Sequence, residues 1–156
     1  MMTQAFLYSV EREFPVPVRT LWSAWTEAEK LEDWYFPTDL NSVKGATVSD
    51  MKVDGLWTCA VDVPEHNFIA YFFGKYLTIQ EFEKIEHTLH YTQSVEEFEA
   101  KNFETESHLI VLNFEERGIN SWVKFSQFGV LPEGEAEQAQ AGMESYLDSL
   151  SNFLLK

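Results

Sequence analysis

The chain has 156 residues, of which 45% are hydrophobic and 15% aromatic, and its formal net charge is −15. This length and apolar content predict a single domain over residues 1–156 with its own core, and they exclude a disordered chain. The negative charge repels phosphate groups, so we expect neither nucleic acid nor an anionic membrane as a partner.

The chain has one cysteine, Cys59, which excludes an intrachain disulfide. No basic stretch followed by an apolar one stands at the beginning, so we expect no signal peptide. The longest uninterrupted apolar run covers residues 68–73 and is too short to cross a bilayer. These features predict a cytoplasmic protein in which Cys59 is a small buried hydrophobe.

The first predicted strand covers residues 6–14, because apolar and polar residues alternate there. Phe6, Tyr8, Val10 and Phe14 share one face of this strand. Arg12 falls on the same apolar face, so we expect it to need a partner or to lie at the end of the strand.

Two short helices are predicted next. Pro17 is suited to open the first helix, because the missing N–H of a proline costs nothing at that position. Leu21, Trp22 and Trp25 then follow at helical spacing. Thr26, followed three residues later by a glutamate, predicts a capping box for a second helix over residues 28–33.

Strands and turns dominate from residue 43 to residue 130. The predicted strands cover residues 46–53, 56–63, 67–80, 84–93, 108–116 and 121–130. Short connections such as Asp54-Gly55 and residues 81–83 make successive strands antiparallel. Segment 96–106 holds five acids and one lysine; a flexible loop, a loop over a cavity mouth and a short helical turn all fit it.

A long helix ends the chain. Apolar residues recur at three- and four-residue steps from Ala136 to Leu154, which gives one stripe along about six turns. Gly142 in its interior costs about 1 kcal/mol relative to alanine, and we interpret it as a point where the helix passes close to a strand. The element order predicts the α+β class and a helix-grip fold, in which a curved antiparallel sheet wraps around the C-terminal helix.

The sequence resembles the SRPBCC (START-like, birch-pollen-allergen-like) superfamily, and within it the family named after the activator of the heat-shock chaperone ATPase. The opening matches in Pro17, the Leu21-Trp22 pair, Thr26, and Leu31 followed by Trp34. Residues 74–79 and 83–88 look like the central hairpin of that family. Gly129 and the helix through Met143 and Leu150 complete the order. The resemblance implies a helix-grip fold with a cavity between sheet and helix. It fixes no reaction, because relatives include lipid carriers, hormone receptors, cyclases and co-chaperone domains.

The histidines are candidates for metal or acid–base chemistry. His87 and His90 are three residues apart in a predicted strand, so they face opposite ways and do not share a metal. His87 shares its face with apolar residues, and we interpret it as a core histidine bonded to a neighbour; contact with a ligand is the alternative. We expect His90 to be solvated and His66 to lie exposed at a turn. No familiar hydrolase, nucleotide or metal motif is present, so we expect no cofactor and no metal.

The aromatic residues are the remaining signal for a site. We expect a ring-lined cavity between the strands and the apolar stripe of the helix, although rings that simply fill the core fit the composition equally well. The candidate ligand-binding residues are Trp34, Phe36, Trp57, Tyr71, His87, Tyr91, Phe125, Phe128, Met143, Tyr146, Leu147 and Leu150.

Three functions fit these observations. The first is binding of a hydrophobic or aromatic small molecule, lipids included. The second is an enzyme of the cyclase or hydrolase type, with His87 or a cavity tyrosine as general acid or base. The third is a protein-interaction module linked to a chaperone, with the acidic segment 96–106 as its contact surface. The sequence leaves monomer and homodimer open, and it assigns no catalytic residue.

Overall fold

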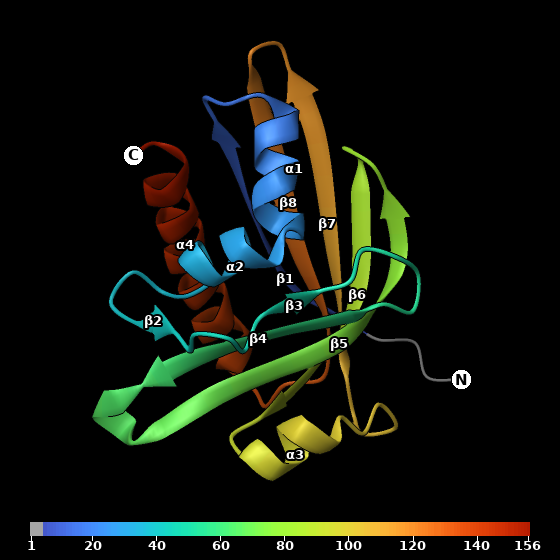
Figure 1. Cartoon of the computed structure of the whole chain (residues 1–156), viewed down its shortest axis with the longest axis vertical. Helices are drawn as coiled ribbons and strands as arrows, with labels where there is room; N and C mark the ends of the chain where they lie inside the picture. The colour runs from blue at the N-terminus through green and yellow to red at the C-terminus, as the bar shows by residue number, and fades with distance from the viewer. Residues whose placement is uncertain (1–4) are drawn as a thin grey trace.

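The computed structural model describes residues 5–156 and shows a helix-grip fold of the α+β class, as predicted (Figure 1). An eight-stranded antiparallel sheet, counted over these residues, curls around a long C-terminal helix, α4 (Glu135–Leu154). The path of hydrogen-bonded neighbours through the sheet is β1-β8-β7-β6-β5-β4-β2, and β3 also pairs with β4.

The elements follow the expected order along the chain. The strands are β1 (Ala5–Phe14), β2 (Asn41–Ser42), β3 (Val48–Ser49), β4 (Leu56–Val63), β5 (Phe68–Gln80), β6 (Lys84–Thr92), β7 (His108–Arg117) and β8 (Asn120–Gly129). The other helices are α1 (Val18–Thr26), α2 (Ala28–Trp34), α3 (Val95–Ala100) and a 3₁₀ turn (Pro64–His66). None of the helices in residues 5–156 is long and apolar enough to span a bilayer.

Strand β1 alternates as expected except at its beginning. Tyr8, Val10 and Phe14 are buried in the core. Phe6 was predicted to join them, but it is 58% exposed. The register shifts between Phe6 and Tyr8, so Phe6 turns to the opposite face and packs against Phe128, with ring centroids 5.6 Å apart. A β-bulge of this kind adds one residue and reverses the pattern before it.

Arg12 ties the first strand to the last helix. Its guanidinium donates to the carboxylates of Asp148 at 2.7 Å and Glu144 at 3.3 Å, both on α4. The basic side chain on the apolar face of β1 therefore has the partner that the sequence pattern required. The two ion pairs, which are partly exposed, link α4 to β1.

Helices α1 and α2 pack between the sheet and α4. The predicted capping box is wrong: the Thr26 hydroxyl donates to the Trp22 carbonyl at 2.9 Å, and Glu27 occupies the N-cap of α2, where its side chain accepts no capping bond from the helix. The Trp34 indole donates to the Ala24 carbonyl at 2.8 Å and joins the two helices. Ser149 on α4 donates to the Trp34 carbonyl at 2.7 Å.

The strand expected over residues 46–53 is reduced to the two residues of β3. The chain turns back at residues 50–55, where Asp50 donates its N–H to the Leu56 carbonyl at 2.9 Å. Only glycine fits at position 55, because a Cβ there would lie 2.0 Å from the Asp50 carbonyl oxygen. The backbone therefore turns too sharply for a longer strand.

The interpretation of Gly142 as a close helix–strand contact is also wrong. A Cβ at this position would meet no atom within 4 Å, apart from its own helix backbone and chain neighbours.

The segment after β6 forms the short helix α3, one of the three forms that fitted it. The Ser94 hydroxyl caps this helix by accepting from the Glu97 N–H at 3.3 Å.

Candidate functional site

The concave face of the sheet is formed by every second residue of its strands. On β6 these include Ile85 and His87, and His87 stands opposite Tyr76 on β5 and Ile110 on β7. All four residues are buried and belong to the main core. The pairing of β6 with β7 stops at Leu89, although β6 continues to Thr92. The hollow under the sheet is therefore open at this end, next to the start of α4.

A cavity of about 880 Å³ lies at this open end and is lined from both faces of β6, because Leu89 and Tyr91 face the hollow whereas His90 and Thr92 face the segment around α3. Its walls come from β5, β6, the beginning of β7, the end of β8, the segment around α3 and the first turns of α4. Apolar side chains in its lining are Phe72, Phe73, Leu89, Tyr91, Ala100, Val130, Leu131 and Ala139. The polar ones are His90, Thr92, Glu97, Asn102, Thr105, Glu106, His108 and Gln127.

The deeper part of the hollow is packed with rings. Tyr35 lies between Trp57 and Tyr146, with centroid distances of 5.6 Å and 4.9 Å. Trp57 in turn stacks on His87 at 4.3 Å. Burial raises the pKa of both tyrosines, so their hydroxyls stay protonated. Rings therefore fill the deep half of the hollow, and the cavity lies at the other end.

His87 is a neutral core histidine. Its Nδ1 donates to the Thr88 carbonyl at 2.7 Å, which leaves Nε2 without the proton. Burial lowers its pKa to about 4. The imidazole is therefore uncharged at neutral pH, and it does not line the cavity. A role as general acid has no support from this placement.

A hydrogen-bonded chain crosses the inner wall beside the cavity. The Tyr8 hydroxyl donates to Gln127 Oε1 at 2.6 Å, and Gln127 Nε2 donates to His108 Nδ1 at 2.7 Å. His108 Nε2 then donates to the Val130 carbonyl at 3.1 Å. Each donor has an acceptor, so the chain holds the Gln127 amide and the His108 ring in one orientation. These three residues were not predicted as a group from the sequence.

His90 is covered, and the expectation that it is solvated is wrong. Its ring is 2% exposed and stacks on Phe73 with centroids 4.7 Å apart and planes 8° from parallel. Phe103 from the segment after α3 meets it edge-on at 5.8 Å. Thr105 donates its hydroxyl proton to the Asn102 carbonyl, so His90 Nδ1 is the donor in its 2.8 Å bond to Thr105. Burial lowers the pKa of His90.

The structure brings together nine of the twelve candidate ligand-binding residues on the inner side. Tyr91 lines the cavity itself. Those in the packed interior are Trp34, Trp57, His87, Phe125, Met143, Tyr146, Leu147 and Leu150.

The other three candidates lie elsewhere. Tyr71 occupies the convex face of β5, where it stacks on Phe98 of α3 at 4.6 Å. Phe128 lies on the outer face of β8 against Phe6, because it is three residues from the inward Phe125. Phe36 lines a small cleft of about 190 Å³ between α2 and the end of α4. These three side chains are therefore not part of the cavity wall.

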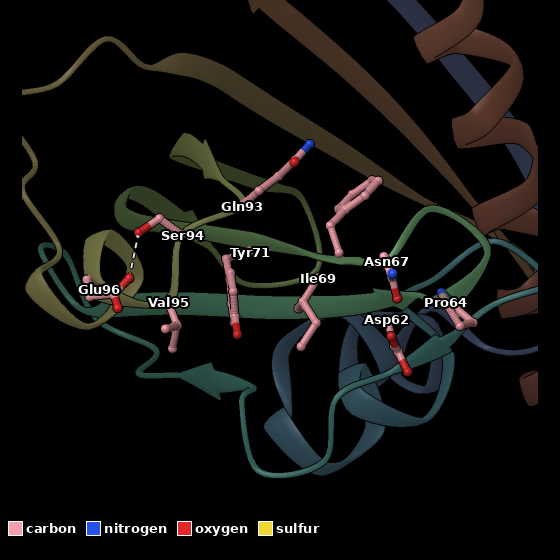
Figure 2. A pocket seen from close by; sticks show the side chains of 10 residues that line it. Asp62, Pro64, Asn67, Ile69, Tyr71, Gln93, Ser94, Val95 and Glu96 are labelled. Atoms are coloured by element: carbon pink, nitrogen blue, oxygen red, sulfur yellow. Dashed lines mark hydrogen bonds between the residues drawn. The ribbon is translucent and has the colours of Figure 1, made fainter.

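A second cleft, of about 580 Å³, lies on the convex side of the sheet (Figure 2). It runs from the turn between β4 and β5 to the start of α3. Figure 2 shows Ile69, Tyr71 and Val95 along it, with the Ser94 hydroxyl donating to the Glu96 carboxylate at 3.1 Å. No residue of α4 contributes to this cleft, so it is separate from the hollow of the sheet.

No metal site accompanies either cleft. Within residues 5–156, no three His, Cys, Asp or Glu side chains are grouped to hold a metal ion.

Cys59 is 2% exposed, and burial raises the pKa of its thiol. The cysteine is therefore the buried hydrophobe that the sequence predicted, and its thiol is protonated at neutral pH.

Comparisons with known proteins support one family. The model of the family AHSA1, described as activator of Hsp90 ATPase homolog 1-like protein, matches residues 15–154. No curated protein sequence matches the chain. Among solved structures, a protein from Chromobacterium violaceum is similar with a TM-score of 0.79 and 15% identity, over 96% of each chain.

Two further structures share the fold. The AHSA1 protein from Silicibacter pomeroyi has a TM-score of 0.78 at 16% identity, over 94% of this chain and 96% of its own. A protein from Staphylococcus epidermidis has a TM-score of 0.75 at 23% identity, over 99% of this chain and 92% of its own. At such identities, the similarity concerns the fold and carries no activity with it.

Proposed function

This chain belongs to the family of activator of Hsp90 ATPase homolog 1-like proteins, and we propose that it binds a hydrophobic or aromatic small molecule, lipids included, between the sheet and the start of α4. The observation that carries the proposal is the cavity of about 880 Å³ at the open end of the hollow. Sites for small molecules have volumes of roughly 300–1,000 Å³ and are lined mainly by apolar groups with a few fixed polar ones.

The lining supplies both requirements. Phe72, Leu89 and Leu131 offer apolar surface, and its burial by a ligand contributes about 25 cal/mol per Å² before the costs of association. Gln127 and His108 are already oriented by the chain that starts at Tyr8. A ligand would therefore meet polar groups that need no rearrangement, which lowers the entropic cost of binding.

We propose a cytoplasmic location for this activity, and its support is the single reduced and buried Cys59. The other two functions have weaker support. His87 is neutral and stands outside the cavity lining. In the acidic segment, Phe98 and Phe103 pack against the convex face of β5 and β6, so they are covered by the sheet and less available to a protein partner.

Fluorescence titration with the neutral dye N-phenyl-1-naphthylamine tests the proposal. We expect its emission to rise and saturate with a micromolar dissociation constant. Ala139→Trp places a large ring in the cavity lining and should abolish this signal. Ala141→Trp is the matched control, because Ala141 is exposed on the same helix and does not line the cavity. Absence of dye binding, or equal loss in both variants, would contradict the proposal.

A further inference from the structure

We propose that the cavity selects ligands that join an apolar body to a positive charge, such as alkyl or aralkyl amines, over neutral and anionic molecules of the same size. This inference rests on the proposed function and adds the charge of the ligand to it. It follows from which ionisable groups line the cavity, which of them carry charge, and where the nearby lysines lie.

The lining carries negative charge and no positive charge. Glu97 and Glu106 are part of the wall, and we call these two acids the rim. No lysine or arginine is part of the wall. Of the two histidines in the wall, His90 has its pKa lowered by burial, and His108 Nδ1 accepts a hydrogen bond from the Gln127 amide. An anionic head group would find no counter-charge in this wall.

Glu97 is held in position at the rim. Its Oε2 accepts from the Thr92 hydroxyl at 2.7 Å, and its backbone N–H is capped by Ser94. Thr92 also accepts from the Ser94 N–H at 3.0 Å. Thr92, Ser94 and Glu97 therefore hold one another in position. A carboxylate that is already ordered loses little entropy when a cation pairs with it.

The lysines of this region do not neutralise the rim. Lys101 lies over the Phe98 ring at 4.3 Å and donates to the Phe98 carbonyl at 2.9 Å. Lys75 lies over the Phe103 ring at 4.5 Å. Within residues 5–156, neither lysine forms an ion pair with Glu97 or Glu106. The negative charge of the rim thus stays available to a ligand.

Aromatic rings extend the same preference into the cavity. Phe72 and Tyr91 lie on neighbouring strands with centroids 5.4 Å apart, and both line the wall. Tyr91 is 53% exposed, so its ring can be reached by a ligand. The electron-rich faces of such rings attract ammonium groups, and they bind apolar chains as well.

Isothermal titration with decylamine, decanol and decanoate, below their aggregation concentrations, separates charge from apolar burial. The amine is charged at pH 7.5, as lysine is. In 20 mM salt we expect the amine to bind about tenfold more tightly than decanol, a difference of 1.4 kcal/mol, and decanoate more weakly than decanol. Added salt should narrow the gap between amine and alcohol, because it screens the rim.

Two variants locate the effect. Glu97→Gln keeps an acceptor for Thr92 and should weaken amine binding roughly fivefold, a larger loss than for decanol. Glu99→Gln is the control, because Glu99 is an exposed acid of the same helix outside the lining. Equal losses in both variants would assign the effect to net charge and overturn the role of the rim. If all three ligands bind equally, charge selection is wrong and the cavity proposal survives; if none binds, both fail.

Discussion

The imidazole of His87 stacks on the indole of Trp57, with ring centroids 4.3 Å apart and planes 26° from parallel. His87 is 3% exposed, so this contact keeps a titratable ring inside the aromatic core. Burial disfavours the charged form of the ring and lowers its pKa to about 4, from an ordinary value of 6.5. Protonation of His87 therefore works against the folded state.

We expect acid to destabilise the protein through His87. Between pH 6.5 and pH 4 the unfolded chain binds a proton that the folded state excludes, so stability falls as pH falls through this window. The loss amounts to roughly 3 kcal/mol from pH 7 to pH 4. His87→Phe keeps a ring on Trp57 without titrating. Urea unfolding across this range should show a shallower pH slope for the variant, and an unchanged slope would contradict the assignment.

Gly142 offers a stabilising substitution. Because a Cβ there meets no atom within 4 Å beyond its own helix backbone and neighbours, Gly142→Ala should raise the unfolding free energy by about 1 kcal/mol. Gly55→Ala is the contrast, since its Cβ would lie 2.0 Å from the Asp50 carbonyl and must distort the turn. Thermal denaturation of both variants checks the pair. A destabilised Gly142→Ala would mean that the helix is crowded at this point.

The bond from Tyr8 to Gln127 is expected to contribute to stability. Tyr8→Phe removes the hydroxyl that donates to Gln127 Oε1. Gln127 is only 9% exposed, so the loss of this donor should lower the unfolding free energy by about 1–3 kcal/mol. Adding Gln127→Met removes the acceptor as well, so the double variant should lose less than the sum of the two single losses. Denaturant titration of the four proteins measures this coupling. Strict additivity would show that the bond carries no net energy.

Phe98 is expected to anchor α3 on the convex face. Its ring stacks on Tyr71 at 4.6 Å and meets Phe73 at 6.4 Å. Phe98→Ala should therefore increase amide hydrogen exchange in residues 94–107 and leave exchange in β7 and β8 unchanged. Glu99→Ala, an exposed position on the same helix, is the control. Equal protection in the two variants would mean that α3 is held by other contacts.

The sequence predicted the fold from periodicity, because hydrophobic spacing reports which face of each element is buried. The stripe on the last helix and the alternation of β1 both correspond to the core. Periodicity does not report insertions in a strand. The bulge after Phe6 turns its side chain to the opposite face of β1, and the local sequence pattern does not indicate this bulge.

The candidate site was harder to predict, because it depends on contacts between segments far apart in the chain. His90 is covered by residues 103 and 105 of the segment after α3, which hydrophobic spacing in β6 does not indicate. Tyr71 and Phe72 are adjacent, and only the strand register shows that Phe72 faces the hollow beside Tyr91. One available signal was missed. Tyr8 and Gln127 carry hydrogen-bonding side chains at inward positions of two strands that pair with each other.

The early end of the β6–β7 ladder has a kinetic consequence. The last paired residues are Leu89 and His108, and His108 is the first residue of β7, so the end of β6 has no β7 partner where it borders the cavity. Entry of a ligand beside this unpaired end would leave the ion pairs between Arg12 and α4 intact. We therefore expect loading to proceed at the usual encounter-limited rate, and residence time, rather than arrival, to distinguish good ligands from poor ones.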